Sequence, residues 1–161
     1  MKHLLIILSL FLFSFTVISC SDEKEDSTEN SGTTTNTTDD TTKFVGVGES
    51  VTIVRSTDNG ASFSTVTSPT SNDLRGVGFG NNTFVAVGTS GTIVRSTDNG
   101  SSFNNVTSPT STTLWGVGFG NYTFVGVGNS GTIVRSTDNG SSFSTVTSPT
   151  SNFLWGVGFS E

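Results

Sequence analysis

The side chains that could perform chemistry are few, and most of them recur at a single spacing. An Arg-Ser-Thr-Asp run appears three times at equal intervals, and its charged members are Arg55, Asp58, Arg95, Asp98, Arg135 and Asp138. Guanidinium groups bind carboxylates, and carboxyl groups act as general acids and bases. The run is therefore the first place to look for an active site. The chain has one His, His3, and one Cys, Cys20. Residues 21–161 therefore contain no His or Cys for nucleophilic catalysis.

The same counts argue against a metal site, a disulfide and a nucleic-acid partner. One Cys cannot form an internal disulfide, and one His cannot build a metal site. A calcium loop of the EF-hand type that begins at Asp58 would end at Pro69, where such a loop needs Glu. The formal net charge of −6 has the wrong sign for binding a nucleic acid. We expect no cofactor, no metal and no nucleic acid.

The elements that position the Arg-Asp run come from one sequence unit that is present three times. Residues 44–83, 84–123 and 124–161 align without gaps, and the first two units match at 30 of 40 positions. Each unit contains four short stretches rich in β-branched and aromatic residues. In the second unit these stretches are 84–88, 92–96, 102–107 and 114–119. Turn sequences such as Asp-Asn-Gly and Ser-Pro-Thr-Ser separate them.

This period predicts an all-β fold made of β-propeller-type blades. Four short antiparallel strands in a repeat of about 40 residues are typical of a propeller blade and not of a helical repeat. Alanine, the best helix former, occurs only at Ala61 and Ala86. In the stretch 114–119 and its copies, glycine alternates with Val and Phe, which leaves one face of the strand bare. Glycine weakens a strand unless another backbone approaches closely, so we predict that this strand is the innermost one of each blade.

The most informative motif is Ser-Thr-Asp-Asn-Gly with a Phe shortly after the glycine. It resembles the Asp-box of bacterial neuraminidase repeat (BNR) proteins, and the wider phrase Gly-Thr-Ile-Val-Arg-Ser-Thr-Asp-Asn-Gly resembles repeats of the propellers similar to the photosystem II stability/assembly factor. The residues that carry the resemblance are Ser56, Asp58, Gly60, Phe63, Ser96, Asp98, Gly100, Phe103, Ser136, Asp138, Gly140 and Phe143. Asp and Ser can hydrogen-bond the turn backbone, glycine can take the positive φ, and the aromatic ring can plug the sheet edge. The resemblance implies a structural hairpin turn, remote from any active site.

The resemblance also invites a test for sialidase chemistry. The resemblance implies a site with a clamp of three arginines, a Tyr nucleophile with a Glu partner, and an Asp acid/base. Here the three arginines are copies of one position, the only Tyr is Tyr122, and the only Glu residues beyond residue 43 are Glu49 and Glu161. We therefore expect no enzymatic activity. A sialidase-like glycoside hydrolase and an assembly or stability factor for a membrane complex stay open as alternatives.

A binding surface is predicted where the three copies differ. The differing positions are Glu49/Thr89/Asn129, Asp73/Thr113/Phe153, Arg75/Trp115/Trp155 and Asn82/Tyr122. They fall mainly in the loops before and after the innermost strand. We expect that Trp115, Trp155, Tyr122 and Arg75 bind a sugar or a partner protein. The alternative is that the Trp side chains simply wedge between blades.

The strand phase raises the question of how the ring closes. Residues 44–67 supply three strands, 74–107 and 114–147 supply two full blades, and 154–159 is a lone copy of the innermost strand. This offset is typical of a propeller clasp, in which the first and last strands share a blade. Propellers usually have four to eight blades, so we expect two chains to clasp each other as a six-bladed homodimer. An open arc, or a gene that has lost or gained repeats, stays open.

Residues 1–43 predict an export signal followed by a tether. A short basic start is followed by an apolar run over 4–18, which is the layout of a secretory signal peptide. Val17-Ile18-Ser19-Cys20 resembles the lipobox of bacterial lipoproteins, which implies cleavage after residue 19 and lipidation of Cys20. An ordinary cleaved signal is the alternative. We therefore divide the chain into a signal peptide (1–19), a lipidated Cys with a disordered acidic and Thr-rich tether (20–43), and the repeat domain (44–161).

The composition of the tether is the basis for predicting the cellular location of the protein. Residues 21–43 hold seven of the 13 acidic residues and not one apolar side chain, so they cannot form a core. The cluster 22–26 resembles the export signals of some bacterial surface lipoproteins. We expect a lipid-anchored protein of the bacterial cell envelope, in the outer membrane and exposed at the surface, although a tether without sorting information fits equally well. The expected function is a non-enzymatic propeller module that binds a protein or a glycan.

Overall fold

The structure, a computed structural model, describes residues 42–160. The predicted signal peptide, the predicted lipidation site at Cys20 and nearly all of the predicted tether lie outside the described residues. Within the described range, no helix is long and apolar enough to cross a membrane.

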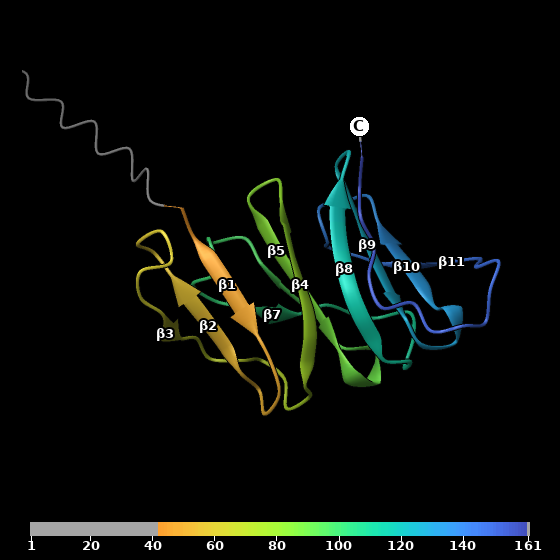
Figure 1. Cartoon of the computed structure of the whole chain (residues 1–161), viewed down its shortest axis with the longest axis horizontal. Helices are drawn as coiled ribbons and strands as arrows, with labels where there is room; N and C mark the ends of the chain where they lie inside the picture. The colour runs from red at the N-terminus through yellow and green to blue at the C-terminus, as the bar shows by residue number, and fades with distance from the viewer. Residues whose placement is uncertain (1–41, 161) are drawn as a thin grey trace, which may run out of the picture. The chain divides into compact units, whose positions relative to one another are not determined.

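The described residues form three antiparallel sheets that follow the three repeats (Figure 1). The first blade contains β1 (Phe44–Val47), β2 (Ile53–Ser56) and β3 (Ser64–Thr65). The second contains β4 (Leu74–Gly80), β5 (Thr83–Gly88), the 3₁₀ turn η1 (Thr89–Gly91), β6 (Ile93–Ser96) and β7 (Asn104–Asn105). The third contains β8 (Leu114–Gly120), β9 (Thr123–Gly128), the 3₁₀ turn η2 (Asn129–Gly131), β10 (Ile133–Ser136) and β11 (Ser144–Val146).

Each strand pairs with the strand that follows it in the same blade, as propeller blades require. In the second blade, for example, Phe79 lies opposite Phe84 and Val85 lies opposite Arg95. The third blade has the same register at the equivalent positions, with Phe119 opposite Phe124. The prediction of four-stranded antiparallel blades is confirmed for the second and third repeats, although β7 is shorter than the predicted stretch 102–107.

The core lies between neighbouring blades because both faces of the middle blade are covered. All six residues of β5 are buried. Phe84 and Ala86 face a cluster shared with the first blade, whereas Val85 and Val87 face a cluster shared with the third. Successive side chains of a strand point to opposite faces, so the period of two in the sequence places alternate residues of β5 in two different cores.

The innermost strands β4 and β8 run side by side, and glycine is what lets them do so (Figure 1). A Cβ atom added at Gly76 would lie 2.8 Å from the carbonyl oxygen of Trp115, and one added at Gly78 would lie 3.1 Å from that of Val117. The predicted packing reason for the alternating glycines is therefore confirmed: the bare face of β4 meets the backbone of β8.

The C-terminal stretch corrects one prediction. Residues 154–159 follow the course expected of a further innermost strand, because the Leu154 amide donates to the Gly128 carbonyl (3.0 Å) and the Trp155 carbonyl lies against Gly116. They nevertheless form no strand. Their predicted clasp partner, β1, lies at the other end of the three blades (Figure 1). A strand needs a neighbouring strand with a ladder of hydrogen bonds, and the described residues supply no such strand to this stretch.

Replacing Gly76 by Ala tests the close approach of the inner strands. The added Cβ meets backbone, which cannot move aside cheaply, so we expect a loss of about 1–3 kcal/mol in the free energy of unfolding. Urea denaturation measures it. Ser101→Ala, on an exposed turn of the same blade, is the control and should change the midpoint little. Equal midpoints for both variants would contradict the assigned role of Gly76.

Candidate functional site

The aspartates of the recurring run are held by local hydrogen bonds in each copy. In the second copy, the Ser96 hydroxyl donates to Asp98 Oδ1 (2.7 Å) and accepts a bond from the Gly100 amide (2.9 Å). Asp98 also accepts bonds from the amide and the hydroxyl of Ser102, at 3.0 and 2.6 Å. The same contacts recur in the other two copies. The carboxylates are thus engaged with their own turn.

The backbone of this turn explains the Asn-Gly pair. Asn99 and Gly100 both have positive φ, 58° and 79°, and the Ser101 amide donates to the Asp98 carbonyl (3.3 Å). This is the geometry of a type I′ turn, which Asn-Gly favours because both residues tolerate the left-handed region. The hydrogen bonds and the glycine φ are those that the motif leads one to expect.

The arginines of the run join neighbouring blades. Arg55 Nε donates to the carbonyl of Asn99 (2.6 Å), and Arg95 Nε donates to that of Asn139 (2.7 Å). Each guanidinium therefore holds the turn of the next blade. Arg135 is exposed and has no such carbonyl among the described residues. Because β2, β6 and β10 belong to three different sheets, the three arginines serve separate places and make no shared clamp.

The aromatic residue of the motif packs between blades. Phe103 is buried in the cluster between the first and second blades, and Phe143 packs against the next cluster. Phe63, the first copy, is 53% exposed. The sequence predicted that this ring would plug the sheet edge. The structure places the ring of Phe103 or Phe143 in the gap beside the preceding blade.

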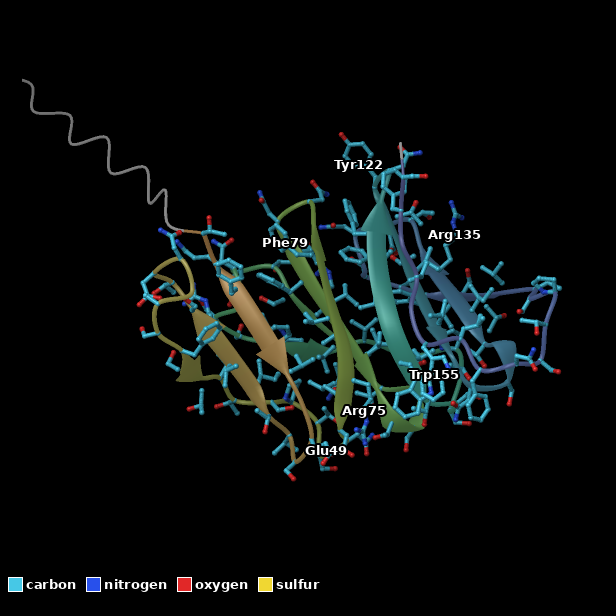
Figure 2. All side chains as sticks on the ribbon, viewed as in Figure 1. Glu49, Arg75, Phe79, Tyr122, Arg135 and Trp155 are labelled. Carbon is cyan, nitrogen blue, oxygen red and sulfur yellow. The ribbon has the colours of Figure 1, made fainter. Side chains whose placement is uncertain are left out.

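A row of cationic and aromatic side chains crosses the starts of the innermost strands. The Arg75 guanidinium carbon lies 5.6 Å from the centre of the Trp115 ring. The rings of Trp115 and Trp155 are 5.0 Å apart, and those of Trp155 and Phe153 are 5.9 Å apart. Trp155 is 63% exposed and Phe153 is 52% exposed. We call Arg75, Trp115, Trp155 and Phe153 the aromatic row. Figure 2 shows Arg75 and Trp155 at the same end of the blades.

The strand pairing is irregular at the positions of Arg75 on β4 and Trp115 on β8. The register between β4 and β5 shifts between Leu74 and Gly76, and the register between β8 and β9 shifts between Leu114 and Gly116. The residue inside each irregularity is Arg75 or Trp115. A bulge changes the direction of the side chain it contains. The row therefore lies where the strand pattern is interrupted.

Polar contacts fix the first two members of the row. Arg75 bonds the carboxylates of Glu49 (2.8 Å) and Asp73 (2.9 Å), and Trp115 Nε1 donates to Asn129 Oδ1 (2.6 Å). Exposed ion pairs contribute little stability singly, but two carboxylates and a ring face together restrict where the guanidinium can lie. Glu49, Asp73, Asn129 and Phe153 all occupy positions where the repeats differ, which was the signal for them in the sequence.

Tyr122 does not join the other predicted binding residues. It lies on the hairpin between β8 and β9, at the opposite end of the blades from Trp155 (Figure 2). There it is 74% exposed and lines a shallow pocket with Phe119 and Phe159. The structure thus brings together Arg75, Trp115 and Trp155 and leaves Tyr122 apart. Across residues 42–160, no three acidic, His or Cys side chains are grouped so that they could hold a metal ion.

Hydrogen bonding lowers the pKa of the three turn aspartates. The Ser62 hydroxyl, then the Ser56 hydroxyl, lower the pKa of Asp58 from 3.8 to about 2. Bonds from Ser142 and then Ser136 lower the pKa of Asp138 to about 2. Burial alone would raise the pKa of Asp98, but the bonds from Ser102 and Ser96 outweigh it and bring that pKa to about 2.

These low pKa values predict acid sensitivity. The unfolded chain binds more protons than the folded one between its ordinary aspartate pKa of 3.8 and about 2, so stability falls as the pH drops through this window. We expect the urea midpoint to decrease as the pH is lowered from about 5 to about 2, with most of the decrease below about pH 4. The triple variant Asp58→Asn, Asp98→Asn, Asp138→Asn should show a flatter profile. A variant profile as steep as that of the parent would assign the acid sensitivity to other groups.

Comparisons with known proteins agree with the blades. No protein-family model matches this chain, and no curated protein matches it. Among solved structures it is similar to YCF48 bound to a D1 peptide, at 22% identity and a TM-score of 0.57 over 66% of this chain and 38% of that one. It is also similar to YCF48 from Cyanidioschyzon merolae, at 20% identity and a TM-score of 0.53 over 63% and 32%.

A third similar structure is the GH74 enzyme of Niastella koreensis, at 26% identity and a TM-score of 0.44 over 65% of this chain and 16% of that one. This chain therefore spans well under half the length of the proteins it resembles. YCF48 is a β-propeller of the group that the sequence motifs resemble. The likeness to the two YCF48 structures shows that this chain has the fold of a β-propeller.

Proposed function

We propose that this chain is a non-enzymatic binding module that holds a segment of a partner protein on the aromatic row. The observation that carries the proposal is the row itself: a guanidinium and three aromatic rings in successive contact, two of them more than half exposed. Trp and Arg are the side chains that most often dominate the energy of a protein interface. Exposed aromatic rings grouped in this way favour a docking function.

The charged groups elsewhere support binding over catalysis. Asp58, Asp98 and Asp138 are ionised and bonded to their turns, so none of them holds a proton for acid catalysis near neutral pH. Arg55 and Arg95 are bonded to backbone carbonyls of the next blade. Apart from Arg135, the groups that first suggested an active site are used to build the blades.

The partner we favour is a protein segment and not a glycan. The rings of the row are tilted toward one another, with 45° between Trp115 and Trp155 and 73° between Phe153 and Trp155, so they offer ridges and edges more than one flat platform. Arg75, Glu49 and Asp73 add charges of both signs at one end, which suits a polar peptide backbone and side chains. YCF48, a structural neighbour, has been captured with a D1 peptide, and its fold supports this use of a propeller.

Membrane anchoring completes the proposal. The lipobox-like sequence at Cys20 and the acidic tether after it support display of the module on the bacterial envelope through a lipid, in the outer membrane and facing outward. A tether over residues 21–43, which has no apolar side chains, would let the blades reach partners away from the lipid surface.

Removing a ring from the row tests the binding function. Peptides selected from a random phage-displayed library on the full chain are the probe, with binding measured by fluorescence anisotropy. We expect Trp155→Ala to weaken an enriched peptide about tenfold or more, because an exposed aromatic anchor is lost. Trp155 is exposed, so its loss should leave the thermal unfolding midpoint nearly unchanged. Tyr122→Ala, the control at the opposite end, should bind as the parent does.

Three outcomes would overturn this proposal. Peptide binding that survives Trp155→Ala would place the site elsewhere. Binding on a glycan array, without peptide binding, would make the ligand a sugar. Turnover of a fluorogenic sialoside would restore the hydrolase alternative.

A separate variant tests the anchor. Cys20→Ser removes the thiol that the lipidation needs, so cells given labelled palmitate should incorporate label into the parent and not into the variant. The variant should also accumulate as the uncleaved precursor. Equal labelling of both proteins would refute the anchoring part of the proposal and leave the binding part untouched.

A further inference from the structure

The two ends of the blade series are complementary to each other. The first blade has three strands, and its β1 occupies the place that β5 and β9 occupy in the other blades. In those blades an innermost strand, β4 or β8, pairs with that place. At the other end, residues 154–159 follow the course of an innermost strand and have no strand to pair with among the described residues. Within residues 42–160, one end of the series lacks the innermost strand whose sequence the other end carries.

Two phenylalanines at these ends are each half of a repeated pair. In the second blade the rings of Phe79 and Phe84 lie 4.5 Å apart, and in the third blade those of Phe119 and Phe124 lie 4.7 Å apart. The next pair in this series would join Phe159 to Phe44. Phe44 is 46% exposed, whereas its copies Phe84 and Phe124 are buried. Phe159 is 54% exposed, as is its paired copy Phe79 at 52%, so the loss of burial falls on Phe44.

A third core cluster is present in two separated halves. Each cluster between blades takes an Ile and a Leu, and both of these residues are buried in the first two clusters, as Ile53 with Leu74 and Ile93 with Leu114. The third copies, Ile133 and Leu154, are only partly buried. The phenylalanine that would close this cluster is Phe63, which is exposed although its copy Phe103 is buried.

Glycines and an arginine repeat the same pattern. A Cβ atom at Gly76 or Gly116 would meet the carbonyl oxygen of Trp115 or Trp155, but one at Gly156 has no heavy atom within 4 Å. Arg55 and Arg95 bond the turn of the following blade, whereas Arg135 has no following blade among the described residues. These contacts, which join adjacent blades elsewhere, are left unmade at the two ends.

The number of blades selects the stoichiometry. A ring closed by whole copies of the described residues contains a multiple of three blades. Propellers have typically four to eight blades, and six is the only multiple of three in that range. Two copies related by a two-fold axis would make two identical junctions, and each would bury Phe44 and Phe63 as Phe84 and Phe103 are buried in the middle blade.

We propose that a second copy of this chain closes the ring, with residues 154–159 of each copy forming the innermost strand on β1 of the other. The repeat sets the register: Gly76 lies opposite Val87 and Gly116 opposite Val127, so Gly156 lies opposite Val47 of the second copy. By the same rule Phe159 lies opposite Phe44 of the second copy. Arg135 then donates to the carbonyl of Asn59 of the second copy.

Ring closure also completes the aromatic row. The residues at the row's position in six successive blades become Arg75, Trp115 and Trp155, followed by the same three from the second copy. Trp155, now exposed at the end of the row, then lies beside Arg75 of the second copy. The Trp115 indole bonds Asn129 in its own blade, and the matching position for Trp155 is Glu49 of the second copy. The proposal does not depend on which ligand the row binds.

Gly156→Ala tests the junction between two copies without changing the fold of a single chain. In a single chain the new Cβ meets nothing, so circular dichroism and the thermal midpoint of the monomer should not change. In the ring it would meet the Arg75 carbonyl of the second copy as Gly116 meets that of Trp155. We expect dimerisation about tenfold weaker or more, measured by sedimentation of the full chain in mild detergent. Ser101→Ala is the control, and a monomeric parent would overturn the proposal.

Cysteine cross-linking tests the register. Residues directly opposite in a sheet have Cα atoms close enough for a disulfide. The full chain with Phe44→Cys and Phe159→Cys should therefore run as a covalent dimer on a non-reducing gel. The control carries Phe159→Cys with Asn104→Cys on β7, the outer strand of the middle blade. The parent, with Cys20 alone, sets the background.

The gel distinguishes the competing arrangements. A covalent dimer that disappears on reduction supports the two-copy ring. A monomer without free engineered thiols would mean that one chain closes on itself. A ladder of larger species would mean an open filament, and a pattern equal to that of the control pair would mean open ends. Each of these last three results overturns the proposal.

Discussion

The close approach of backbone to backbone between innermost strands is the constraint on which the other contacts depend. Gly76 leaves no room for a Cβ atom beside the Trp115 carbonyl, so the strands meet without side chains between them. Because the strands lie this close, the side chains of β5 can fill both gaps beside the middle blade, and the turn of each blade comes within reach of the arginine before it. The aromatic row exists because equivalent positions on these strands are stacked side by side.

The charged residues of the recurring run, apart from Arg135, stabilise the blades and the contacts between them. The Asp98 carboxylate bonds its own turn, and Arg95 bonds the turn of the next blade, so a run that has the composition of an active site is a joint between blades. The positions at which the repeats differ are the ones that we propose for binding. Arg75, Trp115 and Trp155 occupy one position in three copies, and their chemistry differs where the structural contacts do not require identity.

Part of the candidate site could be predicted from sequence and part could not. Variation among copies pointed to Arg75, Trp115, Trp155 and Tyr122, because positions that the fold does not constrain are free to differ. It could not show that Tyr122 lies on a hairpin at the far end, since both strand ends carry variable loops. Nor could it show that Glu49 and Asp73 hold Arg75, since they meet it through a blade contact and an irregular strand pairing.

By itself, the sequence determined the all-β class, the four strands of each full blade, the local turn at Asp98 and the glycine-bearing inner strand. These features are local, because they follow from alternation, turn chemistry and a repeat that can be counted along the chain. Only the tertiary structure decided that Phe103 packs beside the preceding blade, that Arg55 bonds the following one, and that residues 154–159 have no strand to pair with among the described residues of their own chain. Each of these contacts depends on which surfaces of neighbouring blades meet. The spacing of residues along the sequence does not specify how far apart those surfaces lie.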